Sequence, residues 1–380
     1  MSIAIGLGAV ALAIWLGLVF GRGFFWWPRL PALAPEPARW PRVAAVMPAR
    51  DEAELVGKAV GSLLCQDYPG DFRVILVDDH SSDGTAEVAR RSADQVVGGA
   101  RFDIVKAPML PPGWTGKLAA MNCGVEATGD AELLLFTDAD IAHHPRHLRA
   151  LVARLEAEGC DLVSEMVLLN CASLAERFLI PAFVFFFAML YPFPWVGALR
   201  RRTAAAAGGT MLLRRSALVR IGGLAAIKGN LIDDCALARA VKRSGGAIRL
   251  DLTRAALSLR RYESFASIWN MIARSAYTQL RYSPWLLVGT LLGMALTYLA
   301  PPLLLLSADG VAEWMGLAAW LLMGLAYLPM VRFYGLMPVW GLLLPATAAV
   351  YLAATVASAW RHWRGRGGAW KGRVAWRSAR

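Results

Sequence analysis

The chain has 380 residues, of which 57% are hydrophobic and 18% are charged. It is too apolar for an ordinary soluble protein and too charged for membrane helices alone, so we expect a polar domain joined to membrane segments. The net charge of +12 points to anionic lipids and phosphate-bearing ligands, whereas no known motif supports binding of nucleic acid. The five cysteines contain no C-x-x-C pair, which argues against a disulfide framework or a zinc site.

The N-terminal segment predicts a membrane anchor. Residues 3–20 are uncharged and mostly apolar, long enough for a transmembrane helix within segment 1–22. A cleaved signal peptide is the weaker interpretation, because no Lys or Arg precedes the run. The linker 23–42 is basic and rich in proline, and its arginines lie near Trp26 and Trp27. This pattern places the linker and the following domain in the cytoplasm.

From residue 43 onward, short apolar runs alternate with amphipathic stretches. We predict strands at 43–48, 73–77, 102–106, 133–137 and 161–168, with helices at 49–66, 80–91, 117–127 and up to residue 158. Regular alternation of strands and helices predicts an α/β fold, a mostly parallel sheet between helices. We assign residues 43–283 to this cytoplasmic domain.

The stretch LLLFTDADIAHH at residues 133–144 is the strongest local signal for a site. It delivers Asp138 and Asp140 to the end of a buried strand, where ligands of parallel sheets bind. Two carboxylates at this spacing suit a hard divalent cation that also bridges phosphates. The alternative is a solvated turn. A metal site at His143, His144 and His147 is the weaker hypothesis, since no zinc-like partner spacing accompanies it.

Other strand ends also carry acids. Asp51 follows the first predicted strand, and Asp78 and Asp79 follow the second. Such carboxylates can accept hydrogen bonds from a base N–H or from ribose hydroxyls, although helix capping alone would also explain Asp51. Lys117 lies near a predicted helix start, where a cation opposes the helix dipole unless an anion binds there.

A second acidic pair lies further along the chain. Asp233 and Asp234 open a predicted helix, after the glycine pair Gly208 and Gly209. Glycines permit a ligand to approach the backbone closely, so Gly209 is a candidate for donor binding. Two like charges in one pocket raise one pKa and create a general base; favourable interaction with the helix dipole is the simpler alternative.

The remaining apolar segments bear on the membrane topology. Residues 178–199 could span by length, but a crossing there would separate Asp138 from Asp233, so we predict an interfacial segment. Three candidate spans fall within 284–358, at 285–306, 315–330 and 336–357. The basic tail 359–380 would then lie outside, against the positive-inside preference. The number of crossings therefore stays open.

The resemblance to a known family rests on six motifs, VAAVMPARDE, VDDHSSDGT, TGKLAAMNCG, FTDAD, AGGTMLLRRSALVRIGG and LIDDCALARAVKRSGG. In this order, over residues 43–282, the chain resembles the inverting glycosyltransferases of family 2, which have the GT-A fold. It is most similar to the hopanoid-biosynthesis-associated membrane glycosyltransferases.

The resemblance implies a nucleotide-diphosphate sugar donor, usually UDP-linked, and Mg²⁺ or Mn²⁺. It implies that Asp234 is the catalytic base, beside Asp233. Asp138 and Asp140 match the motif for metal and diphosphate. The other matching positions are nucleoside-binding Asp51, Asp78 and Asp79, Lys117 near the donor, and Gln279 and Arg281 in a diphosphate clamp.

Three departures from the family pattern stand out. Asp51 replaces the usual Asn, and Asp233 replaces the usual Glu, which keeps hydrogen-bond acceptors at both positions. The sequence QLRY at 279–282 is one residue shorter than the family's Gln-x-x-Arg-Trp clamp and lacks its Trp. This departure also argues against a processive polysaccharide synthase.

Motifs and membrane segments together predict a multi-pass protein of a bacterial-type inner membrane. Its expected activity is metal-dependent, inverting hexosyl transfer from a UDP-sugar to the hydroxyl of a membrane lipid such as a hopanoid. A polyprenyl-phosphate or sphingolipid-like acceptor is the alternative within this class. A non-catalytic nucleotide-sugar-binding membrane protein is the alternative outside it. The sugar and the oligomeric state are left open.

Overall fold

The computed structural model describes residues 2–365, 369–370 and 373–374, and the chain divides into two compact units. The sheet unit consists chiefly of Arg29–Asn170 and Trp195–Arg261. The helical unit consists of Met1–Pro28, Cys171–Pro194 and Tyr262–Gly368. The chain therefore passes between the two units several times.

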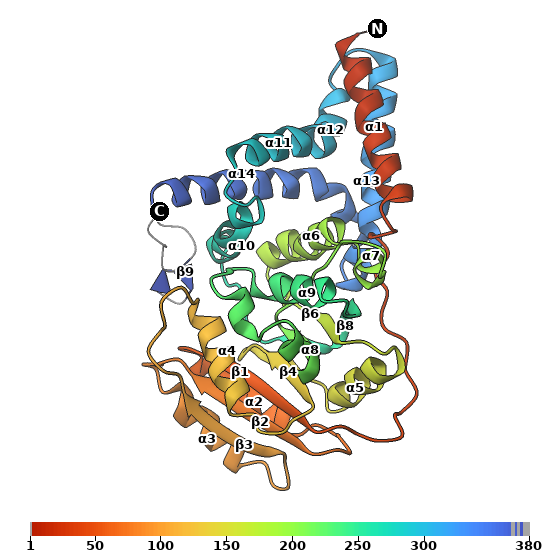
Figure 1. The fold of residues 1–380 in the computed structure, drawn as a ribbon. Helices are drawn as coiled ribbons and strands as arrows, with labels where there is room; N and C mark the ends of the chain where they lie inside the picture. Colours follow the sequence, from red (N-terminus) through yellow and green to blue (C-terminus); the bar gives the residue numbers. More distant parts are fainter. Residues whose placement is uncertain (1, 366–368, 371–372, 375–380) are drawn as a thin grey trace. The chain divides into compact units, whose positions relative to one another are not determined.

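An eight-stranded mixed sheet forms the centre of the sheet unit (Figure 1). Its strands are β1 (Val43–Ala49), β2 (Phe72–Asp78), β3 (Arg101–Lys106), β4 (Leu133–Thr137), β5 (Ile141–His143), β6 (Leu162–Leu168), β7 (Thr210–Arg214) and β8 (Ile248–Ser258). They follow the order β3-β2-β1-β4-β7-β6-β8-β5. β1 to β4 are parallel neighbours, whereas β7 runs antiparallel to β4 and β6. The carboxyl ends of β1, β2 and β4 therefore share one edge.

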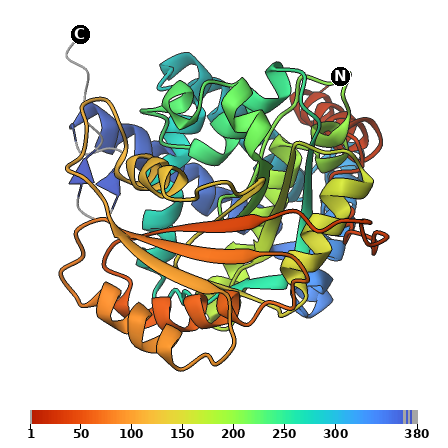
Figure 2. The ribbon, with the colours of Figure 1, turned by 60° about the horizontal axis from the view of Figure 1, so that its bottom comes forward.

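Helices cover both faces of this sheet. They are α2 (Ala53–Leu64), α3 (Thr85–Asp94), α4 (Gly116–Glu126), α5 (His147–Ala157), α8 (Arg215–Arg220), the 3₁₀ helix η1 (Leu224–Ile227) and α9 (Asp233–Arg243). Figure 2 shows α2 and α3 on one face of the first strands and α4 on the opposite face. This layering explains why β1 and β4 read as continuous apolar runs.

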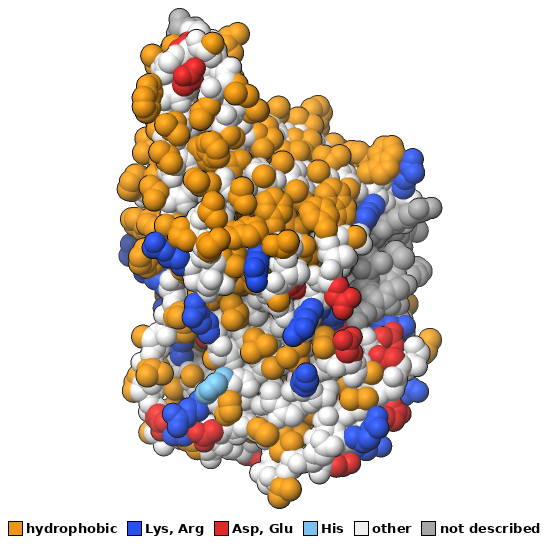
Figure 3. Space-filling view, turned by 180° about the vertical axis from the view of Figure 1, so that it is seen from behind, with side chains coloured by type: hydrophobic (Ala, Val, Ile, Leu, Met, Phe, Trp, Pro, Cys, Tyr) orange, Lys and Arg blue, Asp and Glu red, His pale blue; other side chains and the backbone are white. Residues whose placement is uncertain are grey.

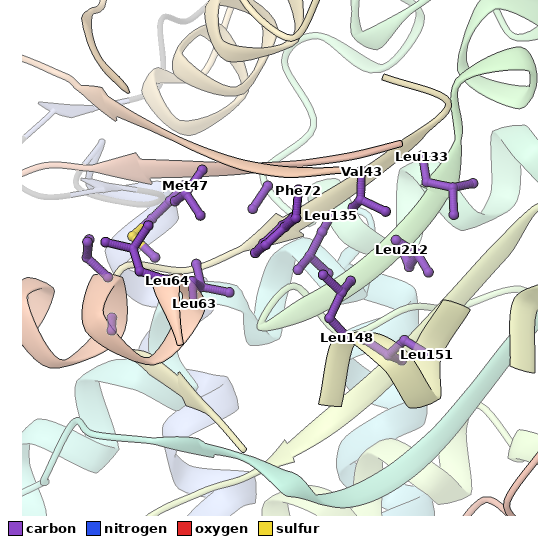
Figure 4. Packing of buried hydrophobic residues seen from close by; sticks show 14 of the residues in the cluster. Val43, Met47, Leu63, Leu64, Phe72, Leu133, Leu135, Leu148, Leu151 and Leu212 are labelled. Atoms are coloured by element: carbon purple, nitrogen blue, oxygen red, sulfur yellow. The ribbon is translucent and has the colours of Figure 1, made fainter. Parts of the chain in front are cut away.

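The core follows the alternation of side chains along β1. Val43 and Met47 point to the same side of the sheet and pack in one cluster with Leu63 of α2 and Leu135 (Figure 4). Each fully buried side chain of this size contributes roughly 1.5–3 kcal/mol. On the other face α4 approaches so closely that a Cβ on Gly124 would lie 2.4 Å from a methyl of the β1 valine beneath it.

The predicted α/β fold is confirmed. The five predicted strands are present with ends shifted by at most one residue. The helix expected at 49–66 is shorter, because its first residues complete β1 and turn toward α2. The strands β5, β7 and β8 were not expected, and β7 makes the sheet mixed.

The helical unit carries the apolar segments. Its helices are α1 (Ile3–Gly21), α6 (Leu174–Leu190), α10 (Phe265–Gln279), α11 (Pro284–Met294), the π-helical η2 (Ala295–Leu299), α12 (Ala300–Leu304), α13 (Gly310–Phe333), the 3₁₀ helix η3 (Pro338–Leu343) and α14 (Leu344–Trp363). Four segments are long and apolar enough to cross a membrane: Ile3–Gly21, Pro284–Leu304, Gly310–Phe333 and Pro338–Trp363. They correspond to the four predicted spans. Hydrophobic side chains dominate the surface over these helices (Figure 3).

Helix α6 contains most of the predicted interfacial segment 178–199. It begins with a capping box in which Ser173 and Glu176 exchange hydrogen bonds. Its Phe185 ring lies 5.1 Å from that of Tyr327 on α13, and its Phe186 ring lies 4.9 Å from that of Tyr351 on α14. These aromatic contacts explain why Cys171–Pro194 clusters with the helical unit and not with the rest of the predicted domain 43–283.

Two shorter features complete the description. Helix α7 (Phe193–Gly197) contains the point where the chain re-enters the sheet unit. The strands β9 (Ala369–Trp370) and β10 (Arg373–Val374) form an antiparallel pair. The rest of the predicted basic tail beyond residue 365 lies outside the described residues.

Candidate active site

The turn between β4 and β5 carries the first two predicted acids. β4 ends at Thr137, and Asp138 and Asp140 follow directly. Asp138 Oδ1 lies 2.7 Å from Lys117 Nζ, and Asp140 Oδ2 accepts a 2.7 Å hydrogen bond from Arg260 Nε. Both carboxylates are thus ion-paired, which differs from the solvated turn that the sequence left open.

Lys117 is the second residue of α4, whose N-cap is Thr115. A cation in the first turn of a helix is opposed by the helix dipole. Here two carboxylates offset this unfavourable interaction with the dipole: besides Asp138, Asp233 lies with its Oδ2 3.7 Å from the Lys117 ammonium. Burial acts to lower the pKa of Lys117, but the two carboxylates raise it above its usual value. Lys117 is therefore charged.

The second acidic pair opens α9, where the helix dipole favours negative charge. Asp234 Oδ2 accepts a 2.9 Å hydrogen bond from the backbone N–H of Gly208, and its Oδ1 accepts one of 2.7 Å from the Cys235 N–H. The neighbouring Asp233 Oδ2 is buried and has no hydrogen-bond partner among the described residues.

Gly208 shows how closely these groups converge. A Cβ built on this glycine would lie 3.2 Å from Lys117 Nζ, 3.5 Å from Asp234 Oδ2 and 3.9 Å from Asp138 Oδ2. Two carboxylates far apart in the sequence therefore lie within 4 Å of one point. Gly209 instead packs against the methyls of Val167, 3.0 Å from its virtual Cβ, so its part in donor binding stays a prediction.

Burial and the like charge of Asp233 make Asp234 a weaker acid than an ordinary aspartate carboxyl group. Its pKa is raised to about 6 by burial and by Asp233, against the opposing effect of Lys117. A carboxylate with this pKa is ionised at neutral pH and can accept a proton from a hydroxyl. Burial and the charge of Asp138 likewise raise the pKa of Asp140, although Arg260 lowers it.

Arg260 and Glu52 were not identified from the sequence. Arg260 follows β8 and joins the turn carrying Asp140 to the start of α2, where its Nη2 lies 2.7 Å and 2.8 Å from the two Glu52 oxygens. The sequence separation between Arg260 and Asp140 is 120 residues. Only the placement of β8 in the sheet brings the two together, so no local pattern could have revealed this pair.

The three predicted nucleoside acids lie at or just after the ends of β1 and β2. Asp51 has a φ of 50°, and its Oδ1 accepts a 2.8 Å hydrogen bond from the Ser82 N–H. Asp78 Oδ1 accepts a 3.2 Å hydrogen bond from the Ser81 N–H. Asp79 is buried, with Oδ2 3.7 Å from Arg50 Nη1. The contacts of Asp51 with Ser82 and of Asp79 with Arg50 join the loops after β1 and β2, and nucleoside binding stays a prediction.

The predicted clamp residues belong to the helical unit. Gln279 ends α10 and donates a hydrogen bond to the Tyr191 hydroxyl. Arg281 follows with a φ of 52°, in the left-handed region. Their part in holding a diphosphate stays a prediction.

The donor set at Asp138 and Asp140 fits a divalent cation in one specific way. Mg²⁺ in phosphate-transfer sites takes one or two carboxylates and completes its shell with phosphate oxygens and waters. The described residues contain no cluster of three or more His, Cys, Asp or Glu suited to a metal. A cation would therefore rely on these two acids, and it would relieve the repulsion that raises the pKa of Asp140.

A family model described as Glycosyl transferase family 21 matches residues 3–378. The chain belongs to this family. The predicted membership of a glycosyltransferase family is thereby confirmed, with a different family number from the one that the motifs suggested. The hopanoid-associated subgroup stays a prediction.

Curated relatives match over part of the chain. It is 31% identical over 142 residues to glycosyltransferase AglE of Haloferax volcanii, covering 36% of this chain and 44% of that protein. It is 28% identical over 130 residues to dodecaprenyl-phosphate galacturonate synthase of Rhizobium johnstonii, covering 34% of this chain and 36% of that protein. These matches span less than half the length of either relative.

The overall fold also matches a solved structure. The mannosyltransferase PcManGT from Pyrobaculum calidifontis, in complex with GDP-Man and Mn²⁺, has a TM-score of 0.55 and 19% sequence identity, covering 94% of this chain and 99% of that chain. At this identity the likeness shows the fold, and it confirms the predicted GT-A architecture.

Proposed function

We propose that this family 21 chain is a membrane-bound, inverting glycosyltransferase that transfers a sugar from a nucleotide-diphosphate donor to the hydroxyl of a membrane lipid. The observation that carries the proposal is the meeting of Asp138, Asp233 and Asp234 around Lys117. This arrangement puts a cation, a candidate metal ligand and a general base into one small site.

The donor is expected to bind with its diphosphate at the Asp138–Asp140 turn. Bound Mg²⁺ or Mn²⁺ would supply charge compensation for the leaving diphosphate. The N-terminus of α4 and the Lys117 ammonium offer further positive charge in the same place. PcManGT, which shares the fold, was solved with GDP-Man and Mn²⁺, and this supports a nucleotide sugar and a metal ion. We expect a UDP-sugar from the sequence motifs.

Asp234 is the proposed base. Its position next to Gly208 is fixed by a backbone hydrogen bond, and its pKa of about 6 suits proton transfer near neutral pH. Asp234 would take the proton from the acceptor hydroxyl as the oxygen attacks the anomeric carbon and the bond to the diphosphate breaks. A single displacement of this kind inverts the configuration at the anomeric carbon.

The acceptor is proposed to be a lipid because the same chain carries four candidate membrane spans. Asp138 and Asp233 both lie next to Lys117, so the chain between them crosses a membrane either not at all or an even number of times. This supports an interfacial α6 and a catalytic unit on one side, which we propose is the cytoplasmic side of a bacterial inner membrane.

The tuned base favours a hydroxyl acceptor such as a hopanoid polyol. A lipid phosphate is already ionised at neutral pH and needs no base to become a nucleophile. The similarity to dodecaprenyl-phosphate galacturonate synthase supports the polyprenyl phosphate as the second candidate. The two acceptors therefore differ in whether transfer depends on Asp234.

The test is Asp234→Asn, which keeps a hydrogen-bond acceptor for the Gly208 N–H but cannot take a proton. We expect transfer to fall by about a hundredfold or more, while UDP binding measured by calorimetry is unchanged. Asp94→Asn, an exposed carboxylate at the end of α3, is the matched control. Retained transfer to a lipid hydroxyl would refute the assignment of the base.

The substrates are identified in a separate experiment. Membranes containing the full chain are incubated with a panel of radiolabelled UDP- and GDP-sugars, and the labelled lipids are extracted and identified by mass. The proposal expects label in a neutral polyol lipid. Label in a polyprenyl phosphate would establish the second candidate, and donor binding without any labelled lipid would indicate a non-catalytic protein.

A further inference from the structure

A buried chain of hydrogen bonds runs inward from the candidate active site. Thr137, which precedes Asp138, lies with its Oγ1 2.9 Å from His143 Nε2 and 2.9 Å from the carbonyl oxygen of Gly209. His143 Nδ1 lies 2.8 Å from His147 Nδ1. His147 Nε2 lies 2.9 Å from Glu165 Oε2. Four side chains are thus joined end to end.

This chain is buried along its whole length. Thr137, His143, His147 and Glu165 are between 1% and 5% exposed. They come from β4, β5, α5 and β6, which are four different elements. The two imidazole rings are stacked, with centroids 5.1 Å apart. Because each of their four ring nitrogens has a protein partner, the histidines form a hydrogen-bonded core and leave no nitrogen for a metal.

The hydrogen bonds can run in two directions. With Glu165 ionised, His147 Nε2–H donates to Glu165, His143 Nδ1–H donates to His147, and Thr137 donates to His143. In the reverse order Thr137 donates to Gly209, His143 Nε2–H donates to Thr137, and His147 Nδ1–H donates to His143. The reverse order needs one additional proton between His147 and Glu165.

The near end of the chain favours the second direction, because only in that order are both contacts of the Thr137 hydroxyl hydrogen bonds: it donates to the Gly209 carbonyl and accepts from His143 Nε2–H. At the far end, Arg154 Nη1 lies 3.9 Å from Glu165 Oε1. Arg154 also pairs with Asp251 and, at 2.9 Å, with Glu158. Burial lowers the pKa of His143 well below its usual value, so this ring is neutral and has a defined tautomer.

The near end of the chain touches both halves of the candidate site. Thr137 directly precedes Asp138, and its hydroxyl donates a hydrogen bond to the carbonyl of Gly209. The adjacent Gly208 N–H holds Asp234. The Thr137 hydroxyl therefore links the turn that carries the metal-ligand candidates to the segment before β7, whose backbone positions the base.

We propose that Thr137, His143, His147 and Glu165 form a brace that positions the Asp138–Asp140 turn relative to Asp234. The brace rests on the proposed function, because its role is to keep the bound donor diphosphate and the base at a fixed distance from each other. None of the four residues contacts substrate in this scheme, so they are positioning residues. Residues that orient metal ligands from behind typically change metal affinity or activity 10–100-fold when replaced, on the order of the effect expected here.

The first test replaces the hydroxyl that joins the two halves. Thr137→Val keeps the shape of the side chain and removes both hydrogen bonds, whereas Thr137→Ser keeps the hydroxyl. We expect Thr137→Val to lower kcat and to weaken Mn²⁺-dependent UDP binding by about 10–100-fold each, and Thr137→Ser to restore both. Thr253→Val, at another buried threonine in β8, controls for loss of a buried hydroxyl alone.

The second test acts at the far end, away from the catalytic turn. Glu165→Gln keeps a hydrogen-bond partner for His147 Nε2, and Glu165→Leu removes it. The brace predicts that Glu165→Leu reproduces the loss of Mn²⁺-dependent UDP binding and that Glu165→Gln largely keeps it. Nitrogen NMR of the labelled full chain should show His143 as the Nε2–H tautomer in the parent and a changed His143 signal in Thr137→Val.

The outcomes separate the brace from the proposed function. Unchanged UDP binding and kcat in both Thr137→Val and Glu165→Leu would overturn the brace, as would losses equal to those of Thr253→Val. If the parent binds UDP with Mn²⁺ but transfers no sugar, the proposed function fails, while the binding and NMR measurements still decide the brace.

Discussion

Replacing Lys117 by Met removes the ammonium between the acidic groups and nearly preserves the length of the side chain. In the parent, burial and Asp233 raise the pKa of Asp234 to about 6, and Lys117 counteracts this rise. A base acts only when ionised, so the parent's transfer rate should fall as the pH drops through about 6. Without Lys117 the pKa of Asp234 rises further, and the acid limb moves to higher pH.

The size of the movement follows from the geometry. Two unit charges 3.7 Å apart, the distance from Lys117 Nζ to Asp233 Oδ2, interact by about 4 kcal/mol at an effective dielectric constant of about 20. Asp234 also lies near the ammonium. In the variant, water that enters the space left by the ammonium solvates the carboxylates and offsets most of this energy. A remaining interaction energy of about 1.4 kcal/mol shifts a pKa by about one unit. We therefore expect the acid limb near pH 7 or above in Lys117→Met.

The assay is single-turnover transfer at saturating donor across the pH range. Lys117→Met should also raise the donor KM, because the ammonium is expected to face the diphosphate, so only the position of the acid limb tests the electrostatic reasoning. Lys58→Met, at an exposed lysine on α2, removes a charge outside the site and should leave the profile unchanged. An acid limb at the same pH in Lys117→Met and the parent would refute the account of Asp234.

Three further outcomes are expected. EDTA should abolish transfer and Mn²⁺ or Mg²⁺ should restore it; full activity after chelation would remove the metal from the mechanism. Gly124→Ala should lower the free energy of unfolding by about 1–3 kcal/mol, because its Cβ would lie 2.4 Å from Val46 Cγ1, whereas Gly61→Ala, with nothing within 4 Å, should not. Arg260→Met should cost about 1–3 kcal/mol in thermal unfolding, because Asp140 loses a charge-assisted hydrogen bond; an unchanged melting temperature would show that the ion pair contributes nothing.

Local patterns were sufficient to predict most of the sheet and its acidic edge. The strands that lead to Asp51, Asp78 and Asp138 are largely apolar, because helices cover both faces of the sheet. Parallel strands bring their carboxyl ends to one edge, so acids at these ends could be expected to lie near each other. The same reasoning could not reach Asp234, whose place next to Gly208 depends on the antiparallel strand β7. Its expected role came from the family resemblance.

Long-range contacts were beyond the sequence. Arg260 lies in a run of polar residues after β8, and nothing in that run indicates a partner 120 residues away. His143 and His147 show the spacing of a weak metal motif, but in the structure their ring nitrogens form hydrogen bonds with Thr137 and Glu165. The buried position of these partners depends on how β4, β5 and β6 pack, which the spacing alone does not encode.

The excursion of residues 171–194 out of the sheet unit has a practical consequence for biochemistry. Cutting the chain after residue 283 would remove the candidate spans that follow α10 but would leave α6 attached, with Phe185 deprived of Tyr327 and Phe186 deprived of Tyr351. Such a fragment would expose an apolar helix surface to water and is expected to aggregate. Enzymology on this transferase is best planned from the outset with the intact polypeptide in detergent or lipid nanodiscs.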